Sequence, residues 1–352
     1  MLLPKNTIKK SICAVGGRSG GHLIPCIYYL EQKKLNNSSI DTTLLLYAQT
    51  ELTTSIINRA TSITHSIPLT IKQVPYTQWY LFPWWGITLC YTFFKSIYIL
   101  LRFRPVEVMS SGGLESIPVC LAARLLCIPV VLLELNVIPG KAVLFLAHFI
   151  NDIHICFSNA ARYFPNNNTT LSPYPIRFSQ QQLNTSHEVA LTHYHLNANK
   201  KTIVILGGSQ GSRSLNRIAA ESIIHFSHHH RQIQVIHQVG NDYSPTYSHL
   251  YTSYNIDHVV IPFEQHAEYL YSSADIIIAR AGAGTLFEIA AFSKPACIVP
   301  LETTTTDHQK DNAQAFANIY PERFLMFLQK DLEHNKTPLV NAIKKLLTIE
   351  DK

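Results

Sequence analysis

The chain has 352 residues, which exceeds one ordinary domain and suits two domains of about 150–180 residues each. Hydrophobic residues make up 47% of it and charged residues 15%, so the sequence can bury large cores and is not that of a disordered protein. Its seven cysteines are scattered without a C-x-x-C pair, which favours buried thiols in a reducing compartment over a disulfide framework or a zinc site.

The net charge of +6 is divided unevenly along the chain. Residues 1–173 carry a net charge of +7, and residues 174–352 carry a net charge of −1. A basic excess can serve nucleic acid or an anionic membrane, but no helix-turn-helix, RNP or zinc-finger pattern accompanies it, so we expect no nucleic-acid partner. The first ten residues are basic and lack the apolar stretch of a signal peptide, and we therefore expect a cytoplasmic protein.

Short apolar runs alternate with helical patterns along both halves of the chain. The predicted strands of the first half are 12–15, 43–47, 106–110, 129–133 and 153–157. Those of the second half are 202–206, 233–237, 258–262, 275–279 and 296–300. The predicted helices include 21–32, 212–226, 284–292 and 307–319.

This alternation predicts an α/β fold with two Rossmann-like, doubly wound parallel sheets. We assign residues 1–173 to the first domain and 174–330 to the second, with the connection between them in the Gln-, Asn- and His-rich stretch 178–201. Residues 331–352 are expected to form a C-terminal helix that packs back across the domains. Because ligands bind at the carboxyl ends of parallel strands, we expect the two domains to face a shared cleft lined by the loops that follow strands.

An aromatic segment at residues 73–94 contains no charged residue and is bounded by lysine on both sides. It holds nine aromatic residues, including every tryptophan in the chain. Its length would admit a transmembrane helix, but two prolines and a glycine argue against a single clean span. Aromatic rings beside basic residues suit the lipid headgroup layer, so we favour an interfacial membrane patch over a core helix or a true span. The residues assigned to this patch are Trp79, Phe82, Trp84 and Trp85.

A glycine-rich loop follows the first predicted strand, with the sequence Gly16-Gly17-Arg18-Ser19-Gly20-Gly21-His22. Glycines let the backbone approach a ligand, and the start of the next helix offers N–H groups to an anion. The pattern is neither a Walker loop nor G-x-G-x-x-G, so it does not indicate NAD(P). His22 is placed for general-base chemistry, although a lone histidine is more often structural.

Three further polar segments follow strands of the second half. The loop 207–212 has the sequence GGSQGS, opens a helix and suits a diphosphate, with the hydroxyl of Ser209 at its centre. The segment 280–288 has small residues at a helix start, and Glu288 one turn later can accept hydrogen bonds from both hydroxyls of a ribose. Arg280 either serves this site or pairs with an acid. The last segment, 307–313, begins a helix with polar side chains that suit a sugar or a diphosphate.

In this order the segments resemble the MurG family. Its members are peripheral membrane glycosyltransferases that add N-acetylglucosamine to the undecaprenyl-diphosphate-linked muramyl-pentapeptide precursor of peptidoglycan. The resemblance covers nearly the full chain, and its most specific parts are GGSQG and RAGA-x-T-x-x-E. It also includes Gly112-Gly113 with Ser116-x-Pro118, Glu134-x-Asn136-x-x-Pro139-Gly140, Pro175-Ile176-Arg177 and His237-Gln238-x-Gly240.

The resemblance implies a GT-B-type fold in which the second domain holds UDP-N-acetylglucosamine and the first holds the lipid-linked acceptor. On the donor side it implies that Glu288 binds the ribose, Ser209 and Arg177 the diphosphate, Gln309 the sugar, and the backbone of Glu264 the uracil. The donor residues so implied are Arg177, Ser209, Glu264, Ala283, Gly284, Thr285, Leu286, Phe287, Glu288, His308 and Gln309. The acceptor residues so implied are Ser19, Gly20, Gly21, His22 and Asn136.

The implied reaction is an inverting transfer in which the muramyl 4-hydroxyl attacks the anomeric carbon while UDP leaves. His22 is the first candidate for the base and Glu134 the second. We expect neither a cofactor nor a metal, since no D-x-D motif is evident and helix N-termini together with Arg177 can receive the charge of the diphosphate. The resemblance also implies a peripheral protein on the cytoplasmic face of the inner (plasma) membrane, in contact with its anionic surface.

The chain departs from the family pattern on the acceptor side. Its first loop is one residue longer than the usual G-G-T-G-G-H, and Leu114, Leu133 and Leu135 replace polar or aromatic residues of the family. Three alternatives therefore stay open. They are another lipid-acceptor glycosyltransferase, such as one that uses diacylglycerol, a UDP-sugar 2-epimerase of the same architecture, and a relic that binds the donor but has lost the acceptor site.

Overall fold

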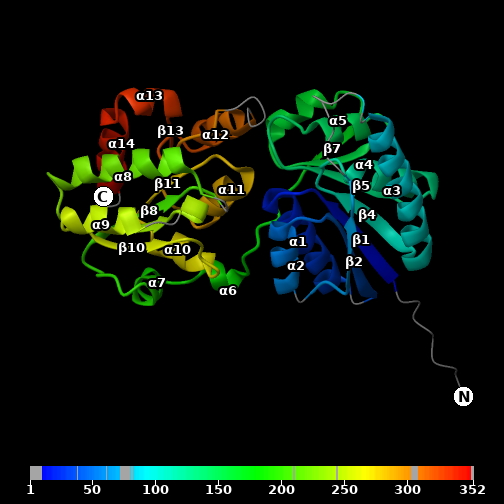
Figure 1. Ribbon diagram of the computed structural model, residues 1–352, viewed down its shortest axis with the longest axis horizontal. Helices are drawn as coiled ribbons and strands as arrows, with labels where there is room; N and C mark the ends of the chain where they lie inside the picture. The colour runs from blue at the N-terminus through cyan, green and yellow to red at the C-terminus, as the bar shows by residue number, and fades with distance from the viewer. Residues whose placement is uncertain are drawn as a thin grey trace, which may run out of the picture. The chain divides into compact units, whose positions relative to one another are not determined.

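The buried apolar runs of the chain form two parallel β-sheets, each in its own unit, in the computed structural model (Figure 1). The structure describes residues 10–37, 39–60, 62–71, 80, 82–208, 211–242, 245–302 and 308–349. The two units divide between Arg177 and Phe178, whereas the sequence analysis placed the domain boundary after residue 173. The predicted fold class, with two doubly wound α/β sheets, is confirmed.

The first unit contains a seven-stranded sheet in the order β3-β2-β1-β4-β5-β6-β7, in which every neighbouring pair is parallel. Its strands are β1 (Lys10–Gly16), β2 (Ile40–Ala48), β3 (His65–Leu69), β4 (Pro105–Ser110), β5 (Val130–Glu134), β6 (Asp152–Ile155) and β7 (Asn168–Leu171). The strand order reverses between β1 and β4, which is the position where open α/β sheets bind ligands.

Helices cover both faces of this first sheet. They are α1 (Gly20–Asn36), α2 (Glu51–Arg59), α3 (Phe82–Phe103), α4 (Ser116–Leu125) and α5 (Lys141–Leu146), with a 3-10 helix at Ser158–Tyr163. In Figure 1, α1 and α2 lie on one side of the sheet, and α3 and α4 lie on the other. Alternate residues of β1 and β2, such as Val15 and Leu46, point into the core beneath α3 and α4.

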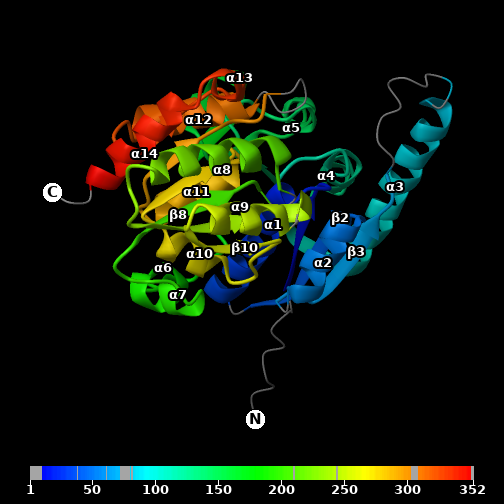
Figure 2. The same cartoon turned by 60° about the vertical axis from the view of Figure 1, so that its left-hand side comes forward.

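Helix α3 runs along the outside of the first sheet (Figure 2) and contains most of the predicted aromatic patch. Its second half packs on the core through Thr92, Ser96, Ile99 and Leu100, which are buried. Between Phe82 and Tyr91 the described side chains are all exposed or half-buried. Proline in the first turn of a helix has no intrahelical N–H bond to lose, so Pro83 does not interrupt α3. This differs from the expectation that Pro83 argues against one continuous helix.

The second unit contains a six-stranded parallel sheet in the order β10-β9-β8-β11-β12-β13. Its strands are β8 (Lys201–Leu206), β9 (Ile233–Gln238), β10 (Asp257–Ile261), β11 (Ile276–Ala279), β12 (Ala296–Ile298) and β13 (Phe324–Met326). Its helices are α6 (Gln180–Leu183), α7 (His187–His193), α8 (Arg213–Ser227), α9 (Pro245–Ser253), α10 (Ala267–Ser273), α11 (Ala283–Ala291), α12 (His308–Ile319), α13 (Gln329–His334) and α14 (Thr337–Ile349), with a 3-10 helix at Gly240–Asp242. The strand order reverses here between β8 and β11.

The C-terminal helices α13 and α14 belong to the core of the second unit. Leu332, Leu339, Ile343 and Leu346 are buried together with residues of α8, β8 and β11. In Figure 1, α14 lies beside α8 at the end of the chain. The described part of segment 331–352 therefore completes one face of the second sheet.

Candidate active site

Two glycine-containing loops touch at the carboxyl edge of the first sheet, after the neighbouring strands β1 and β4. A Cβ atom on Gly113 would lie 2.8 Å from the Cα atom of Gly17, so the loops meet backbone to backbone. Gly112 and Gly113 also have φ angles of +91° and +94°, which side chains rarely adopt. Glycine is therefore required here, and the contact holds the loop that opens α1 against the loop that opens α4.

His22 lies in the first turn of α1, beside this contact. Cβ atoms on Gly17 and Gly112 would lie 3.5 and 3.6 Å from its imidazole ring, and its Nδ1 is 2.6 Å from the carbonyl oxygen of Ser111. Because a carbonyl only accepts hydrogen bonds, Nδ1 carries the proton and Nε2 carries the lone pair of the neutral ring. Burial lowers the pKa of His22, against smaller opposite effects of the Ser111 carbonyl and of Glu115. The neutral ring can therefore accept a proton at Nε2.

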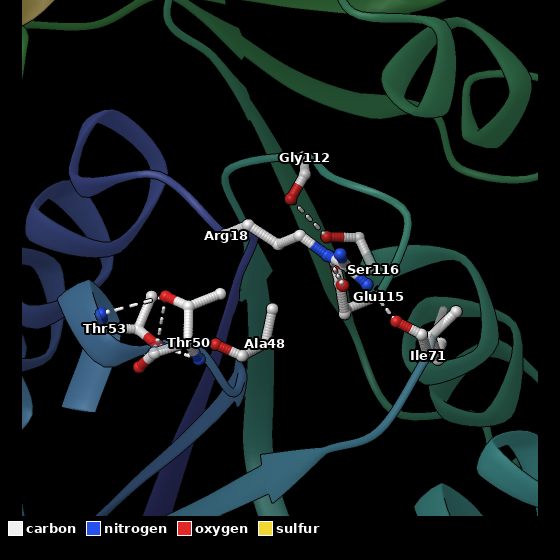
Figure 3. Close-up of polar contacts among 8 residues, drawn as sticks. All are labelled: Arg18, Ala48, Thr50, Thr53, Ile71, Gly112, Glu115 and Ser116. Carbon is white, nitrogen blue, oxygen red and sulfur yellow. Dashed lines mark hydrogen bonds and ion pairs between the residues drawn. The ribbon is translucent and has the colours of Figure 1, made fainter. Parts of the chain in front are cut away.

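Arg18 connects three loops at the same edge (Figure 3). Its Nε donates to Oε1 of Glu115 at 3.2 Å, and its Nη2 donates to the carbonyl of Ile71, just after β3. Glu115 is 1% exposed, whereas the Arg18 side chain is 37% exposed. The neighbouring loop after β2 is closed by neutral groups instead, through the capping box of Thr50 and Thr53 that begins α2. The guanidinium of Arg18 thus connects the loops after β1, β3 and β4.

Glu134 ends β5 and has both carboxylate oxygens engaged by the loop that follows. Its Oε1 accepts from the backbone N–H of Asn136 at 2.8 Å and from the Asn136 amide at 3.2 Å, and its Oε2 accepts from the N–H of Gly140 at 3.1 Å. Its exposed fraction is 2%, and burial raises the pKa of Glu134 to about 7 despite these hydrogen bonds. The geometry therefore suits Glu134 to organising the loop 135–140.

A second glycine loop lies at the carboxyl edge of the second sheet, between β8 and α8. A Cβ atom on Gly207 would lie 2.7 Å from the backbone nitrogen of Ser212, and one on Gly211 would lie 2.1 Å from the carbonyl oxygen of Val239. The side-chain amide of Asn216 donates to the same Val239 oxygen at 3.1 Å. The loop is thus folded tightly against the end of β9, and it leads into the N-terminus of α8, which attracts anions.

Arg280 follows β11, the neighbour of β8, and lies beneath this second loop. Its guanidinium donates to the hydroxyls of Ser212 and Ser214, at 2.7 and 2.8 Å from Nη2. The same group donates to Oε1 of Gln329 at 2.7 Å and to the carbonyls that end β12. It is 5% exposed, and burial lowers the pKa of Arg280 to about 10. Among the described residues its partners are neutral oxygens, so Arg280 does not form the acid pair that the sequence analysis considered.

Helix α11 begins directly after Arg280, at the carboxyl edge of the sheet. Ala283 and Leu286 are buried, and Phe287 packs edge-on against Phe316, with 5.0 Å between ring centroids. The side chains of this first turn therefore serve packing, which leaves the backbone to meet a ligand. The carboxylate of Glu288 accepts a hydrogen bond from the Tyr271 hydroxyl at 2.6 Å.

The sequence matches known protein families and relatives over most of its length. Residues 12–155 match the N-terminal domain of glycosyltransferase family 28, and residues 202–352 match the C-terminal domain of that family. The chain is 30% identical over 306 residues to the UDP-N-acetylglucosamine–N-acetylmuramyl-(pentapeptide) pyrophosphoryl-undecaprenol N-acetylglucosamine transferase of Flavobacterium psychrophilum, covering 86% of this chain and 81% of that protein. It is 28% identical to the protein of the same name in Bacillus subtilis, covering 96% and 91%. The chain belongs to the MurG family.

Solved structures share the fold of this chain. The crystal structure of MurG from Acinetobacter baumannii matches with a TM-score of 0.71 at 22% identity, covering 96% of this chain and 92% of that one. UDP-GlcNAc 2-epimerase from Methanocaldococcus jannaschii matches with a TM-score of 0.61 at 12% identity, covering 96% and 92%. At these identities the likeness concerns the fold alone.

The acceptor residues implied by the MurG family gather at one edge of the first sheet. Ser19 is the exposed N-cap of α1, and its carbonyl accepts from the N–H groups of His22 and Leu23 at 3.1 Å. Gly20 is buried, and Gly21 is exposed at the first turn of the same helix. Asn136 lies in the loop after β5, where its amide is tied to Glu134. These residues lie at the loops after β1 and β5, the strands on either side of β4.

The donor residues implied by the MurG family lie at the carboxyl edge of the second sheet, with two exceptions. Arg177 is exposed and is the last residue of the first unit, and Ser209 lies outside the described residues. The backbone N–H of Glu264 donates to Gln238 at 3.0 Å, so its carbonyl is the backbone group left for a base edge. In the first turn of α12, His308 is half-buried and Oε1 of Gln309 accepts from the N–H of Leu301 at 3.0 Å.

Several groups at these edges escaped the sequence analysis. Arg18 and Glu115 are 97 positions apart, and no local pattern relates them. The Ser111 carbonyl that orients His22 is a backbone group, which carries no sequence signal at all. Gln329 was assigned no role, although it receives the Arg280 guanidinium. The one available signal was the repeated proximity of arginine to a glycine loop, at Arg18 and again at Arg280.

The departures from the MurG family pattern are mainly in the core. Leu133 and Leu135 flank Glu134 and are buried, while Leu114 is half-buried in the loop after β4. No group of three or more His, Cys, Asp or Glu side chains is placed to hold a metal ion in the described parts of the chain.

The predicted membrane patch forms an exposed stripe on α3, with Trp79 outside the described residues. Trp84 is 70% exposed, Phe82 is exposed, and Trp85 is half-buried with its ring edge-on to Phe82. The stripe continues at helical spacing through Ile87, Tyr91, Phe94, Tyr98 and Leu101. By length and composition α3 is the one helix in the described chain that could cross a membrane, and 22% of its apolar window is buried.

Proposed function

We propose that the chain transfers N-acetylglucosamine from UDP-N-acetylglucosamine to the 4-hydroxyl of undecaprenyl-diphosphate-linked N-acetylmuramyl-pentapeptide. Membership of the MurG family over nearly the whole chain supports this activity. The observation that carries the proposal is the state of His22, a neutral imidazole oriented by a backbone carbonyl at the switch point of the first sheet. The first unit would hold the acceptor, and the second unit the donor.

His22 is our candidate for the general base. Its Nε2 would take the proton of the muramyl 4-hydroxyl as that oxygen bonds to the anomeric carbon, while the bond from this carbon to the diphosphate oxygen breaks. The Ser111 carbonyl accepts a hydrogen bond from the N–H at Nδ1 and would stabilise the imidazolium that forms. Glu134 is less suited to this role, because both of its oxygens already accept hydrogen bonds from the loop 135–140. Instead it would hold Asn136 in place for the acceptor.

The second unit would receive the negative charge of departing UDP. The N-terminus of α8 faces the glycine loop 207–212, and Arg280 adds a buried positive charge beneath it. We assign the ribose to Glu288, whose carboxylate is held by Tyr271. The uracil edge would meet the carbonyl of Glu264, and Gln309 would bind the sugar. Arg177 would reach the diphosphate from the start of the connection between the units.

A UDP-sugar 2-epimerase has a similar fold, so the test must depend on the acceptor. The experiment measures UDP release from UDP-N-acetylglucosamine with and without the lipid-linked muramyl acceptor. Transfer predicts release only with the acceptor, whereas release that needs diacylglycerol, or donor binding without transfer, would contradict the proposal. His22→Ala should lower turnover by roughly 10²–10⁴-fold with little change in UDP affinity. The matched control is His148→Ala, because His148 is exposed and bonds to carbonyls of its own turn.

We further propose that the exposed stripe on α3 rests on an anionic bilayer, at the cytoplasmic face of the inner membrane. Tyr91, Phe94 and Tyr98 are each at least 65% exposed and lie on one face of α3, and contiguous exposed apolar patches mark interaction sites. Arg102 and Arg104 are exposed at the C-terminal end of the same helix, where they would meet lipid phosphates. The buried residues of the second half hold α3 to its own unit, which favours partial insertion over a full span.

The chain offers an intrinsic probe of this contact, since all three tryptophans lie at positions 79–85. Vesicles containing anionic phosphatidylglycerol and lipids brominated along the acyl chain should quench tryptophan fluorescence. The double variant Phe94→Ser/Tyr98→Ser should weaken vesicle binding about tenfold or more, because it removes apolar area from the stripe. Ile319→Ser is the matched control, since Ile319 is equally exposed but lies on α12. Unquenched fluorescence with bound vesicles would contradict insertion.

A further inference from the structure

The longer first loop of this chain introduces a cation that the family pattern lacks. Where that pattern has a single threonine between the glycine pairs, this chain has Arg18-Ser19. Arg18 is also the residue of the loop that reaches out to other segments, to Glu115 after β4 and to the Ile71 carbonyl after β3 (Figure 3). The insertion therefore places a guanidinium between three loops at the edge that carries His22.

The guanidinium of Arg18 neutralises the buried carboxylate of Glu115. Its carboxylate is almost wholly buried at the start of α4, and a buried charge is costly unless it is paired. Among the described residues, Arg18 is the cation that contacts it. Glu115 also lies against the glycine contact, since a Cβ atom on Gly113 would be 3.4 Å from its Oε2. Moving Glu115 would therefore disturb the packing of Gly113 on Gly17.

We propose that Arg18 is a positioning residue, which fixes the loop before His22 against two neighbouring loops and neutralises the buried carboxylate of Glu115. This inference rests on the proposed acceptor role of the first unit. It assigns the extra loop residue a defined part in the reaction, because the geometry and the charge state of the base both depend on the Arg18–Glu115 pair.

The charge of Glu115 reaches His22, where it favours the protonated ring. The titratable group next to His22 on α1 is Cys26, one turn later, whose thiol donates to the Ser111 hydroxyl at 3.2 Å and whose pKa is raised by burial to about 12. This thiol contributes no negative charge at neutral pH. An unpaired Glu115 would therefore favour the protonated ring of His22 and reduce the fraction of neutral base at a given pH.

The experiment is a pH profile of kcat for four proteins: the wild type, Arg18→Met, Glu115→Gln and the double variant Arg18→Met/Glu115→Gln. In Arg18→Met the acid limb should move upward by on the order of one pH unit. In Glu115→Gln it should move downward, and in the double variant it should return toward the wild-type position. A fall in kcat with no movement of the acid limb in either single variant would overturn the proposal.

Two measurements keep the test decisive. UDP affinity reports the fold of the second unit and should be unchanged in all four proteins. If Arg18→Met does not fold, Glu115→Gln, which leaves the Arg18 cation unpaired, and the double variant, which removes both charges, can still be compared with the paired wild type. NMR titration of the His22 imidazole gives the same shifts without turnover. An inactive wild type would therefore refute the proposed function alone, whereas an unshifted His22 titration would refute the role of Arg18.

Discussion

An arginine stands beside the glycine loop in both units, but the two guanidinium groups are held in opposite ways. Arg18 in the first unit is partly exposed and pairs with the buried carboxylate of Glu115. Arg280 in the second unit is buried and donates to hydroxyl, amide and carbonyl oxygens, none of which is charged. The first arginine therefore forms a direct ion pair. The second donates to neutral oxygens among the described residues, and the carboxylates of Glu333 and Glu302 act on its pKa without a hydrogen bond to it.

This difference matches the charge that each unit would handle. A closed ion pair holds loops in place, and its electric field falls off with distance faster than that of a single charge. A cation held by neutral oxygens leaves its field available, and its position beneath the N-terminus of α8 reinforces the attraction of that helix for an anion. Under the proposed function, the second unit would receive the diphosphate, while the first would need a neutral base and a fixed geometry.

The largest expected effect comes from breaking the pair in the first unit. Arg18→Met leaves Glu115 buried without its partner, and we expect a loss of about 3–5 kcal/mol in the free energy of unfolding. Replacing both residues, as in Arg18→Met/Glu115→Leu, should recover most of this loss because no unpaired charge remains. Denaturant unfolding followed by tryptophan fluorescence measures the effect, since all tryptophans are in the first unit. A double variant no more stable than Arg18→Met would contradict the explanation.

The second prediction concerns how the stability of each unit depends on pH. Glu134 has an ordinary pKa of 4.5 in the unfolded chain and a pKa of about 7 in the folded protein. The folded state therefore binds the proton more tightly, and its advantage is complete below about pH 4.5 and lost as the pH rises through 7. Glu134 should therefore contribute about 3 kcal/mol less stability to the first unit at the upper end of this range, and the lowered pKa of His22 adds a dependence of the opposite sign. Glu134→Gln should flatten the dependence measured by tryptophan fluorescence.

His237 gives the second unit the opposite dependence. It is fully buried in β9, its Nδ1 meets the Tyr251 hydroxyl at 3.0 Å, and burial lowers the pKa of His237 from 6.5 to about 3. The unfolded chain binds the proton more tightly, so the second unit should lose stability as the pH falls below 6.5. Calorimetry at pH 5 and pH 8 should show that Glu134→Gln and His237→Gln change the pH dependence of their units in opposite directions, each relative to the wild type. Changes of the same sign would refute the contrast.

The central strands of both sheets could be predicted from sequence, and the edge strands largely could not. Strands such as β1, β5, β8 and β11 are buried on both faces and therefore appear as continuous apolar runs. The strands that escaped prediction, β3, β7 and β13, all lie at sheet edges. Edge strands are covered on fewer sides, so β7 has the sequence NTTL with mostly exposed side chains, and β3 tolerates a proline.

The candidate site likewise has features that could be predicted from the sequence and features that could not. Glycine loops and His22 could be predicted because close backbone approach and a helix start leave local patterns. The partners that determine their chemistry could not, because pairs such as Arg18 with Glu115 form only when the sheet brings distant loops together. The burial of Leu133 and Leu135 beside Glu134 also could not be predicted, because it depends on the elements that cover both faces of β5 and the loop after it.

The third prediction tests whether the Arg280 charge acts on the diphosphate. Arg280→Met should weaken UDP binding by about 100-fold, since hydrogen bonds that involve a charged group contribute roughly 1.5–3 kcal/mol each. Binding of uridine, which lacks phosphate, should weaken much less. Isothermal titration calorimetry with both ligands distinguishes a loss of charge from a collapse of the site, and equal losses for uridine and UDP would favour collapse. Arg18→Met is the matched control and should leave UDP affinity unchanged.

The smallest expected effects compare two glycines that have open space around them. A Cβ atom on Gly86 or Gly208 would meet nothing within 4 Å, but only Gly208 has a positive φ, at +86°. Gly86→Ala lies inside α3 and should stabilise the first unit by about 0.5–1 kcal/mol, because alanine loses less backbone entropy in a helix. Gly208→Ala should destabilise the second unit by about 1 kcal/mol through backbone strain alone. Because neither side chain would clash, calorimetric shifts of opposite sign would isolate the conformational requirement of the donor loop, and a neutral Gly208→Ala would mean that this loop adopts other backbone conformations at no cost.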